Sequence, residues 1–457
     1  MFFVKRRQLL VGSSLVFLSL LLYLYKLPAM ASFDADQEFY AKQFTEIVFK
    51  HNLTLIGIPA SIDGLFVGPL YTYVAALFYW VFGGHPIGLN LFTVLILSFQ
   101  GPLTYYCIGK IKGERIGLFA ALLCVFTFAY WKKAFIPTPI NFLYMAGLFF
   151  FYFLFRLEKS RRYIYLIALL LGLTLHIHFT LLFFFPIFFI LLFRQKGIRG
   201  VIWYDYLISS LIVLFFALPM VFFDLRHNFL LAKGIFLLFN TVHPNISYFE
   251  NLAKVLGIFF SVFSSLLFGP QGLLSTLLFW LPVLWVVLNI KKNYSYQIVG
   301  LIFLTTLLLF SLYYGHIPDY YFYFLLPMYF FIVSDMVNAV NFVPKGKLFV
   351  LLFFALFISY NLFFMLQALN PYNLFIKQKA VRYIKDKAEN APVTVNVDTE
   401  LGLQYGFDYL MDFNKINRSK EKKTSIYQIQ IRDKRTLEGK EFRENGANGG
   451  IIVSKLM

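Results

Sequence analysis

A short acidic segment near the start of the chain holds the residue types and spacing best suited to chemistry. It reads DADQEFY over residues 34–40, so that one residue separates the carboxylates of Asp34 and Asp36. A carboxylate beside a reacting hydroxyl group can act as a general base. An acidic loop can also be a solvated segment without a further role, and the residues alone leave both interpretations open. The same loop also carries Glu38, Glu46 and Asp63.

The rest of this loop is marked by Gly57, Pro59, Gly64, Gly68 and Pro69. Glycine lets the backbone approach other groups closely, and proline suits the first turn of a helix. The pattern predicts a folded loop over residues 28–85 that leads into a helix near Pro69. Ordinary turns would use the same residue types.

The composition indicates the class of protein that holds this loop. Hydrophobic residues make up 59% of the 457 residues and charged residues 14%, and the mean hydropathy is +0.69. Soluble domains have about 25% charged residues, so the chain is predicted to be a polytopic membrane protein. The net charge of +18 comes from short basic clusters between apolar runs, which argues against nucleic acid as a partner. Cys107 and Cys124 lie in apolar runs and predict neither a disulfide framework nor a thiolate metal site.

Eleven segments are apolar enough to form transmembrane helices, which need about 20 residues to cross a bilayer. They cover residues 8–27, 86–109, 116–131, 140–156, 163–177, 179–193, 203–222, 272–290, 296–314, 321–341 and 348–369. The sequence therefore predicts an all-α polytopic membrane domain of about 11 transmembrane helices.

Two further apolar stretches, residues 69–82 and 252–268, are ambiguous. Counting both as spans would place the basic loop at residues 110–115 outside, against the tendency of cytoplasmic loops to be basic. We therefore expect both stretches to lie at the outer interface. All seven histidines then fall on the outer side, which gathers potential chemistry at one membrane face. Short, basic inner loops would produce the same distribution.

The two ends of the chain differ from the middle. Residues 1–31 combine a basic start, an apolar stretch and an Ala-rich site at Ala29 to Ala31, features shared by signal peptides and uncleaved anchors. The stretch is long enough to span and further spans follow, which favours an anchor with a cytoplasmic N-terminus. Past Asn370 charged residues return and short alternating stretches predict a small extracytoplasmic α/β domain over residues 371–457, after a transmembrane catalytic domain over residues 1–370.

The arrangement resembles the polytopic lipid-linked sugar transferases of the GT-C fold, and most closely the bacterial branch related to protein O-mannosyltransferases and to the lipid A aminoarabinose transferase. In that family the first outer loop carries an acidic motif with a following aromatic residue, and then a proline-containing helix start. Here DQEFY at residues 36–40 corresponds to the first element and GPLY at residues 68–71 to the second. The resemblance extends over roughly residues 1–370.

The resemblance implies transfer of a sugar from a polyprenyl-phosphate donor to an acceptor on the outer face, with inversion of the anomeric centre and an aspartate as general base. Asp36 occupies the motif position and is the first candidate, and Asp34 is the second candidate or a positioning partner. Two departures stand out: Gln37 replaces the second acid of the motif, and Gly68 replaces a basic residue often found before the proline. The second outer loop, residues 131–139, contains no acid, so no metal ligands are assigned and a divalent-metal cofactor has little support.

A departing lipid phosphate needs cations nearby. Lys132 and Lys133 in the second outer loop, and Arg226 with His227 after a predicted span, are the first candidates. Lysines at a membrane boundary also extend toward water without a further role. Arg226 could instead pair with Asp224.

Other polar residues predicted on the outer face are candidates for lining a substrate cavity. His176 and His178 would point about 200° apart on a helix, so a shared metal would require an extended turn, and we expect them to contact substrate instead. His316, Asp319 and Tyr320 form another outer cluster. Anchoring of aromatic residues at the membrane interface is the alternative for this cluster.

We therefore expect an integral, multi-pass glycosyltransferase of the plasma membrane that uses a polyprenyl-phosphate-linked sugar and a protein, lipid or glycan acceptor. The main alternative is a transporter or flippase of lipid-linked glycans, which would place functional charges near the middle of the bilayer. The predicted spans keep nearly all charges at their ends. A structural membrane protein is the third possibility, and it would tolerate replacement of the acids in the loop.

Overall fold

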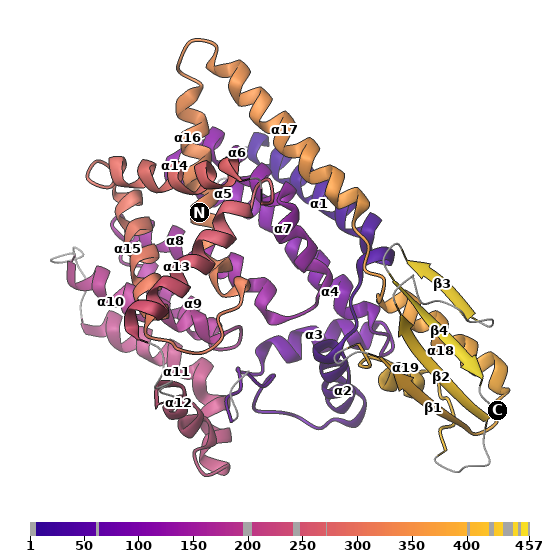
Figure 1. Ribbon diagram of the computed structural model, residues 1–457. Coiled ribbons are helices and arrows are strands. Elements are labelled where there is room, and N and C mark those ends of the chain that lie inside the picture. Colours follow the sequence, from indigo (N-terminus) through magenta and orange to yellow (C-terminus); the bar gives the residue numbers. More distant parts are fainter. Residues whose placement is uncertain are drawn as a thin grey trace.

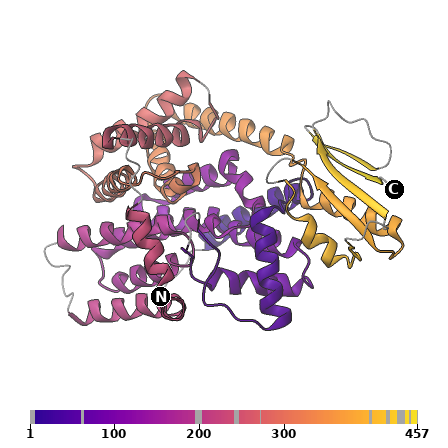
Figure 2. The same cartoon turned by 60° about the horizontal axis from the view of Figure 1, so that its bottom comes forward.

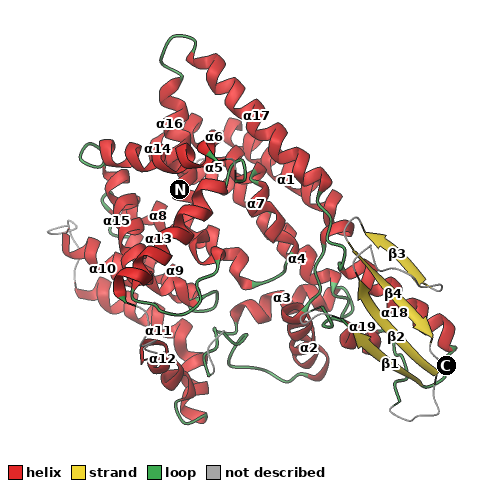
Figure 3. Ribbon diagram, viewed as in Figure 1, coloured by secondary structure: helices red, strands yellow, loops and turns green. Residues whose placement is uncertain are grey.

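The computed structural model describes residues 6–60, 64–194, 203–240, 247–270, 272–399, 403–419, 425–432, 442–446 and 449–455. Helices dominate, and a small sheet lies at one side of the helical body (Figures 1 and 3). Turning the molecule leaves this sheet and its helices at the same side (Figure 2). Asp63 and His243, which the sequence placed on the outer side, lie outside the described residues.

The first half of the chain forms ten α-helices and three 3₁₀-helices within the described residues. They are α1 (Arg6–Met30), α2 (Ala35–Lys50), α3 (Leu70–Val81), α4 (Ile87–Leu97), α5 (Gln100–Lys112), α6 (Glu114–Phe126), α7 (Phe128–Trp131), η1 (Lys132–Phe135), η2 (Pro139–Phe142), α8 (Leu143–Leu157), α9 (Tyr163–Thr174), η3 (Phe179–Phe183) and α10 (Phe184–Arg194).

The second half adds the remaining helices and the sheet. The helices are α11 (Trp203–Arg226), α12 (Leu230–Asn240), α13 (Tyr248–Ser265), α14 (Leu273–Asn289), α15 (Tyr294–Ser311), η4 (Asp319–Leu325), α16 (Leu326–Val340), α17 (Gly346–Gln367), α18 (Leu374–Ala388) and α19 (Phe407–Phe413). The strands are β1 (Val393–Asp398), β2 (Ser425–Arg432), β3 (Phe442–Gly446) and β4 (Gly449–Lys455).

Every one of the eleven predicted spans coincides with helix in the structure. Among the described residues, seven helical segments are long and apolar enough to cross a membrane, and a bent eighth joins Glu114–Phe126 to Phe128–Phe135 at an angle of 56°. The other three predicted spans are shorter apolar helices, at Tyr163–Thr174, Phe179–Ile190 and Leu273–Asn289. The stretches predicted to lie at the outer interface form α3 and α13, and neither helix is both long and apolar enough to count as a span.

The C-terminal domain has the predicted small α/β form. Its four strands are arranged in the order β1-β2-β4-β3, with β1 parallel to β2 and the other pairs antiparallel. Alternate residues of β2, Tyr427 and Ile429, are buried, and Ile429 lies opposite the buried Val453 of β4. This period of two is what a sheet with one covered face requires. Helix α18 packs on the sheet and covers it.

The bend between α6 and α7 has an identifiable cause. Helix α6 stops at Phe126, and Thr127 takes an extended conformation. The amide of Phe128 then donates to Oδ1 of Asn361 on α17, at 2.9 Å. The side-chain amide of Asn361 donates in turn to the carbonyl oxygens of Leu267 and Phe357, at 2.7 and 2.9 Å. Asn361 therefore satisfies a backbone group that the bend would otherwise leave unpaired in apolar surroundings.

Replacement of Asn361 by leucine should destabilise the protein by about 1–3 kcal/mol, because the amide of Phe128 loses its buried acceptor. The measurement is the thermal unfolding midpoint in detergent. Phe363→Leu is the matched control, since Phe363 is on the same helix and is exposed. Equal midpoints for the two variants would contradict the role of Asn361.

Candidate active site

The acidic segment begins α2, and it is fixed to the second outer loop by hydrogen bonds. The amide of Ser32 donates to the carbonyl oxygen of Phe135, at 2.8 Å. Gln37 accepts from the amide of Asp34 at 3.1 Å, and its Nε2 donates to the carbonyl oxygen of Pro137 at 3.2 Å. A carboxylate at position 37 could accept the first bond but could not donate the second. The departure of Gln37 from the acidic motif thus has a structural reason.

Two of the acids in this segment, Asp34 and Glu38, accept hydrogen bonds from the C-terminal domain. Asp34 accepts from Nζ of Lys377 at 2.8 Å. Glu38 is buried and accepts from the amides of Gly406 and Tyr409, at 2.6 and 2.9 Å. These amides lie at the N-terminal end of α19, where a carboxylate is favoured by the helix dipole and by unpaired amide groups. Asp34 and Glu38 therefore stabilise the junction between the two domains.

Asp36 differs from both neighbours. Its carboxylate has no hydrogen-bond or ion-pair partner among the residues that the structure describes, and it opens onto a cavity of about 360 Å³. Desolvation by the surrounding protein, and then the negative charge of Asp34, raise the pKa of Asp36 above its ordinary range. The cavity is lined by Ala35, Asp36, Glu38, Phe39, Tyr40, Lys42, Ile58, Pro59 and Tyr405. Asp36 is thus the acid of this segment that remains available to a bound molecule.

Two predicted site residues, His178 just before η3 and Tyr320 in η4, have neighbouring rings. Tyr320 is within electrostatic range of the Asp36 carboxylate. The ring of His178 lies 6.0 Å from that of Tyr320, between centroids, and its Nδ1 accepts from the amide of Thr180 at 3.2 Å. Burial lowers the pKa of His178 to about 4, so its imidazole is neutral at pH 7. His178 can therefore offer a hydrogen bond to a substrate but not a positive charge.

The two lysines of the second outer loop have different surroundings. Lys133 forms an ion pair with Asp319, with 3.5 Å between Nζ and Oδ2, and Asp319 also accepts from the hydroxyl of Tyr323 at 3.0 Å. Lys132 is exposed and lies over the ring of Phe128 at 5.8 Å. The structure thus pairs Lys133 with Asp319, and Tyr320, the residue after Asp319, is within electrostatic range of Asp36.

His176 supports the loop instead. It is buried, and its Nδ1 accepts from the amide of Leu70 at 3.3 Å. Burial lowers the pKa of His176, which favours the neutral acceptor form. A Cβ on Gly68 would lie 2.0 Å from the same nitrogen, so the turn before α3 requires glycine there. This contact explains why Gly68 replaces the basic residue of the family pattern.

The remaining candidates lie elsewhere. Arg226 and His227 follow Phe223 at the end of α11, where Phe223 packs with Leu65 and Leu231 in a small separate core. Asp224 accepts from the amide of Leu231 at 2.6 Å rather than pairing with Arg226.

The ring of His227 stacks on that of Phe223, with 4.0 Å between centroids. His316 is exposed on the loop before η4. Within the described part of the chain, no hydrogen bond or ion pair joins Arg226, His227 or His316 to the acidic segment.

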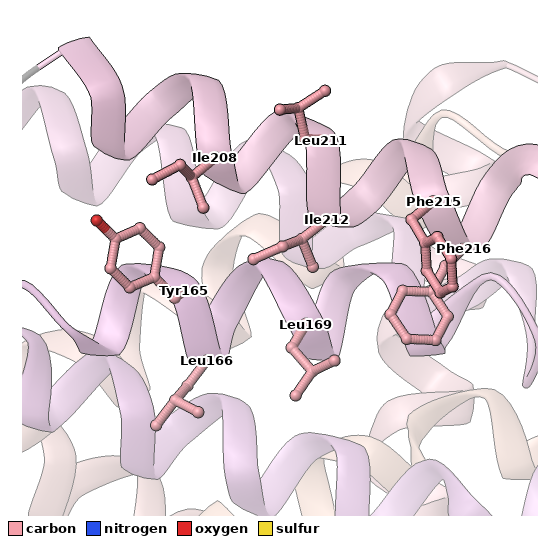
Figure 4. A pocket seen from close by; sticks show the side chains of 8 residues that line it. All are labelled: Tyr165, Leu166, Leu169, Ile208, Leu211, Ile212, Phe215 and Phe216. Carbon is pink, nitrogen blue, oxygen red and sulfur yellow. The ribbon is translucent and has the colours of Figure 1, made fainter.

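An apolar groove of about 590 Å³ runs between α9 and α11. Figure 4 shows the side chains that line it, which are Tyr165, Leu166 and Leu169 of α9, and Ile208, Leu211, Ile212, Phe215 and Phe216 of α11. At one end the ring of Phe216 lies 6.0 Å from that of His176. The groove therefore ends beside the residue that supports the Gly68 turn.

The contribution of the C-terminal domain to the candidate site was not predicted from the sequence. Lys377 and Tyr405 reach the acidic segment from far along the chain, which no local pattern shows. One signal was present: Lys377 shares a helix face with Ala380, Ile384 and Ala388, all buried. A lysine on an otherwise apolar helix face is expected to have a buried partner.

Among the described residues, no cluster of three or more His, Cys, Asp or Glu side chains is arranged to hold a metal ion. No metal ligands are therefore assigned.

Comparisons with known proteins bear on the fold and on the class of enzyme. Residues 67–223 match the family model described as dolichyl-phosphate-mannose-protein mannosyltransferase. No curated protein sequence matches the chain.

The fold is similar to that of ArnT from Cupriavidus metallidurans bound to undecaprenyl phosphate, with 11% identity, a TM-score of 0.59, and coverage of 96% of this chain and 97% of that chain. It is also similar to the archaeal oligosaccharyltransferase AglB from Archaeoglobus fulgidus, in complex with an inhibitory peptide and a dolichol-phosphate. Here the identity is 12%, the TM-score is 0.54, and coverage is 94% of this chain and 70% of that chain. These matches confirm the predicted GT-C membrane fold and the predicted glycosyltransferase class.

Gly68→Ala should destabilise the protein by about 1–3 kcal/mol, because the added methyl group overlaps the His176 ring. Thermal unfolding in detergent measures the effect. Gly257→Ala is the control, since a Cβ there meets no atom within 4 Å. Adding His176→Ala to Gly68→Ala should recover part of the loss by removing the overlapping ring. A Gly68→Ala protein as stable as Gly257→Ala would contradict the proposed contact.

Proposed function

We propose that this membrane glycosyltransferase transfers a sugar from a polyprenyl-phosphate donor to an acceptor hydroxyl on the outer membrane face, with Asp36 as the general base and with inversion of the anomeric carbon. The observation that carries the proposal is the surroundings of the Asp36 carboxylate. It is the acid of the acidic segment that lines a cavity without a hydrogen-bond or ion-pair partner among the described residues.

The proposed reaction uses this carboxylate at the acceptor. The acceptor oxygen attacks the anomeric carbon from the face opposite the phosphate, its proton passes to Asp36, and the bond to the phosphate oxygen breaks with its electron pair. The raised pKa of Asp36 brings the base nearer to neutral pH, where proton acceptance is more favourable than for an ordinary aspartate. No other acid of the segment combines exposure to the cavity with freedom from a partner.

Positive charge for the departing phosphate is proposed to come from Lys132 and Lys133. Lys133 is held by Asp319 and lies over the ring of Tyr323 at 5.8 Å, while Lys132 is exposed beside it. Fixed cations near a leaving phosphate stabilise the charge that develops on it. The relatives bound to undecaprenyl phosphate and dolichol-phosphate support a polyprenyl-phosphate donor.

The groove between α9 and α11 is the proposed place for the isoprenoid chain of the donor. It is almost entirely apolar and lies along helices that the sequence assigns to the membrane. At the end of the groove the ring of Phe216 contacts that of His176, and His176 supports the turn at Gly68. In the proposed orientation the N-terminus is cytoplasmic and the acidic segment faces the opposite side.

Asp36→Asn should reduce the rate of sugar transfer by at least about 100-fold, because the amide cannot accept the proton. Purified protein is supplied with a panel of polyprenyl-phosphate sugars, and donor consumption is measured. Glu46→Gln is the matched control on the same helix, since Glu46 pairs only with Lys50 and Asn52 at the surface in the described structure. A folded Asp36→Asn protein with the parent rate would show that another group is the base.

Leu169→Trp should raise the KM for the lipid donor several-fold with little change in kcat, because the indole fills the groove and reduces binding of the isoprenoid chain. Leu214→Trp is the control, since Leu214 is exposed on α11 but does not line the groove. Initial rates over a range of donor concentrations measure both constants. The same KM in both variants would argue against this place for the chain.

A further inference from the structure

Lys377 of α18 is a lysine whose side chain is completely buried. Its Nζ donates to the carbonyl oxygen of Phe33 at 2.9 Å, to Oδ1 of Asp34 at 2.8 Å and to the carbonyl oxygen of Tyr405 at 2.9 Å. An ammonium group has three N–H donors, so all three are satisfied. A buried charge persists only with such compensation. The side chain is therefore held in one position.

The three acceptors belong to two segments that contribute to the walls of the Asp36 cavity. Phe33 and Asp34 lead directly into the first turn of α2, which carries Asp36. Tyr405 comes from the C-terminal domain and lines the same cavity. One ammonium group thus joins the wall that holds the proposed base to the wall that comes from the C-terminal domain.

Further polar contacts fix the C-terminal domain in the same place. Glu38 accepts from the amides at the start of α19. The hydroxyl of Tyr409 donates to the carbonyl oxygen of Gly84 at 2.7 Å, and Nε2 of Gln378 lies 2.7 Å from Nε2 of His85. The domain therefore docks through specific hydrogen bonds at the acidic segment and at the end of α3.

We propose that Lys377 is a positioning residue for sugar transfer: it sets the separation of the two cavity walls and compensates the charge of Asp34 beside the base, so that the C-terminal domain completes the active site. The proposal rests on the proposed role of Asp36. A purely structural alternative is that Lys377 only attaches the domain and has no effect on the ionisation of Asp36.

The positioning role and the purely structural role of Lys377 predict different ionisation of Asp36, which depends on the charges around it. On its own segment it faces Asp34 and Tyr40, and from η4 it faces Tyr320. Glu38 and Lys42, which also line the cavity, pair with each other at 3.0 Å. Without Lys377 the negative charge of Asp34 is uncompensated, which favours the protonated form of Asp36. The base then ionises at higher pH, and the acid limb of the rate profile moves to higher pH.

The test compares Lys377→Met, Asp34→Asn and the double variant with the parent protein, and uses Lys385→Met on the exposed side of α18 as control. The pH dependence of kcat is measured with an active polyprenyl-phosphate sugar. Lys377→Met should lower kcat at pH 7 and move the acid limb to higher pH. The double variant should return the limb to the parent position or below it, because the uncompensated charge is gone. Lys385→Met should match the parent.

Hydrogen–deuterium exchange provides a readout that does not require activity. Exchange at residues 31–40 and 403–410 should rise in Lys377→Met and stay at the parent level in Lys385→Met. An acid limb that does not move in a folded Lys377→Met protein overturns the proposal, as does unchanged exchange. If the parent protein consumes no donor at all, the proposed function fails, while the exchange result still decides whether Lys377 fixes the two walls. If Lys377→Met does not fold, the double variant is compared with Asp34→Asn: loss of the Lys377 charge should place its acid limb at higher pH, and equal limbs in these two variants would overturn the proposal.

Discussion

Backbone amides and carbonyls in apolar surroundings must find hydrogen-bond partners within the protein, and in this chain that requirement decides where the helices break. The break after α6 depends on Asn361, which binds the freed amide of Phe128 and reaches two further carbonyls. The bend directs the following turn toward the start of α2. There the carbonyl oxygens of Phe135 and Pro137 accept from Ser32 and Gln37. The two loops of the candidate site are thus joined by backbone groups that a straight helix would have used internally.

The acidic segment shows how adjacent carboxylates can have different environments. Asp34 has a buried ammonium partner, and Glu38 has two amides and Lys42. Both charges are therefore compensated within a few ångströms. Asp36 receives no such compensation from the described residues, and desolvation followed by the negative charge of Asp34 raises its pKa. The difference arises from which acids the C-terminal domain reaches, and it leaves the Asp36 carboxylate without a polar partner among the described residues.

Much of the helical body could be predicted from the sequence because apolar length is a strong signal for membrane helices. The acidic segment and the turn at Gly68 were also visible, since both are local. The end of α9 at Thr174 and the 3₁₀ conformation of η3 before α10 were not visible, because a helix that stops early or tightens has the same composition as a regular one. The contacts of Gln37 with Pro137 and of His176 with Leu70 join residues about 100 positions apart. Such pairings depend on tertiary packing, which a single sequence does not display.

The docking of α18 and α19 on the acidic segment has a consequence for the order in which the protein is made. Lys377 and Tyr405 leave the ribosome after all the apolar helices, yet Tyr405 forms part of the wall of the cavity beside Asp36. A nascent chain that has already inserted its helices still lacks this part of the wall. The cavity can therefore form only after residue 405 has been synthesised and the segment around it has docked on the acidic segment.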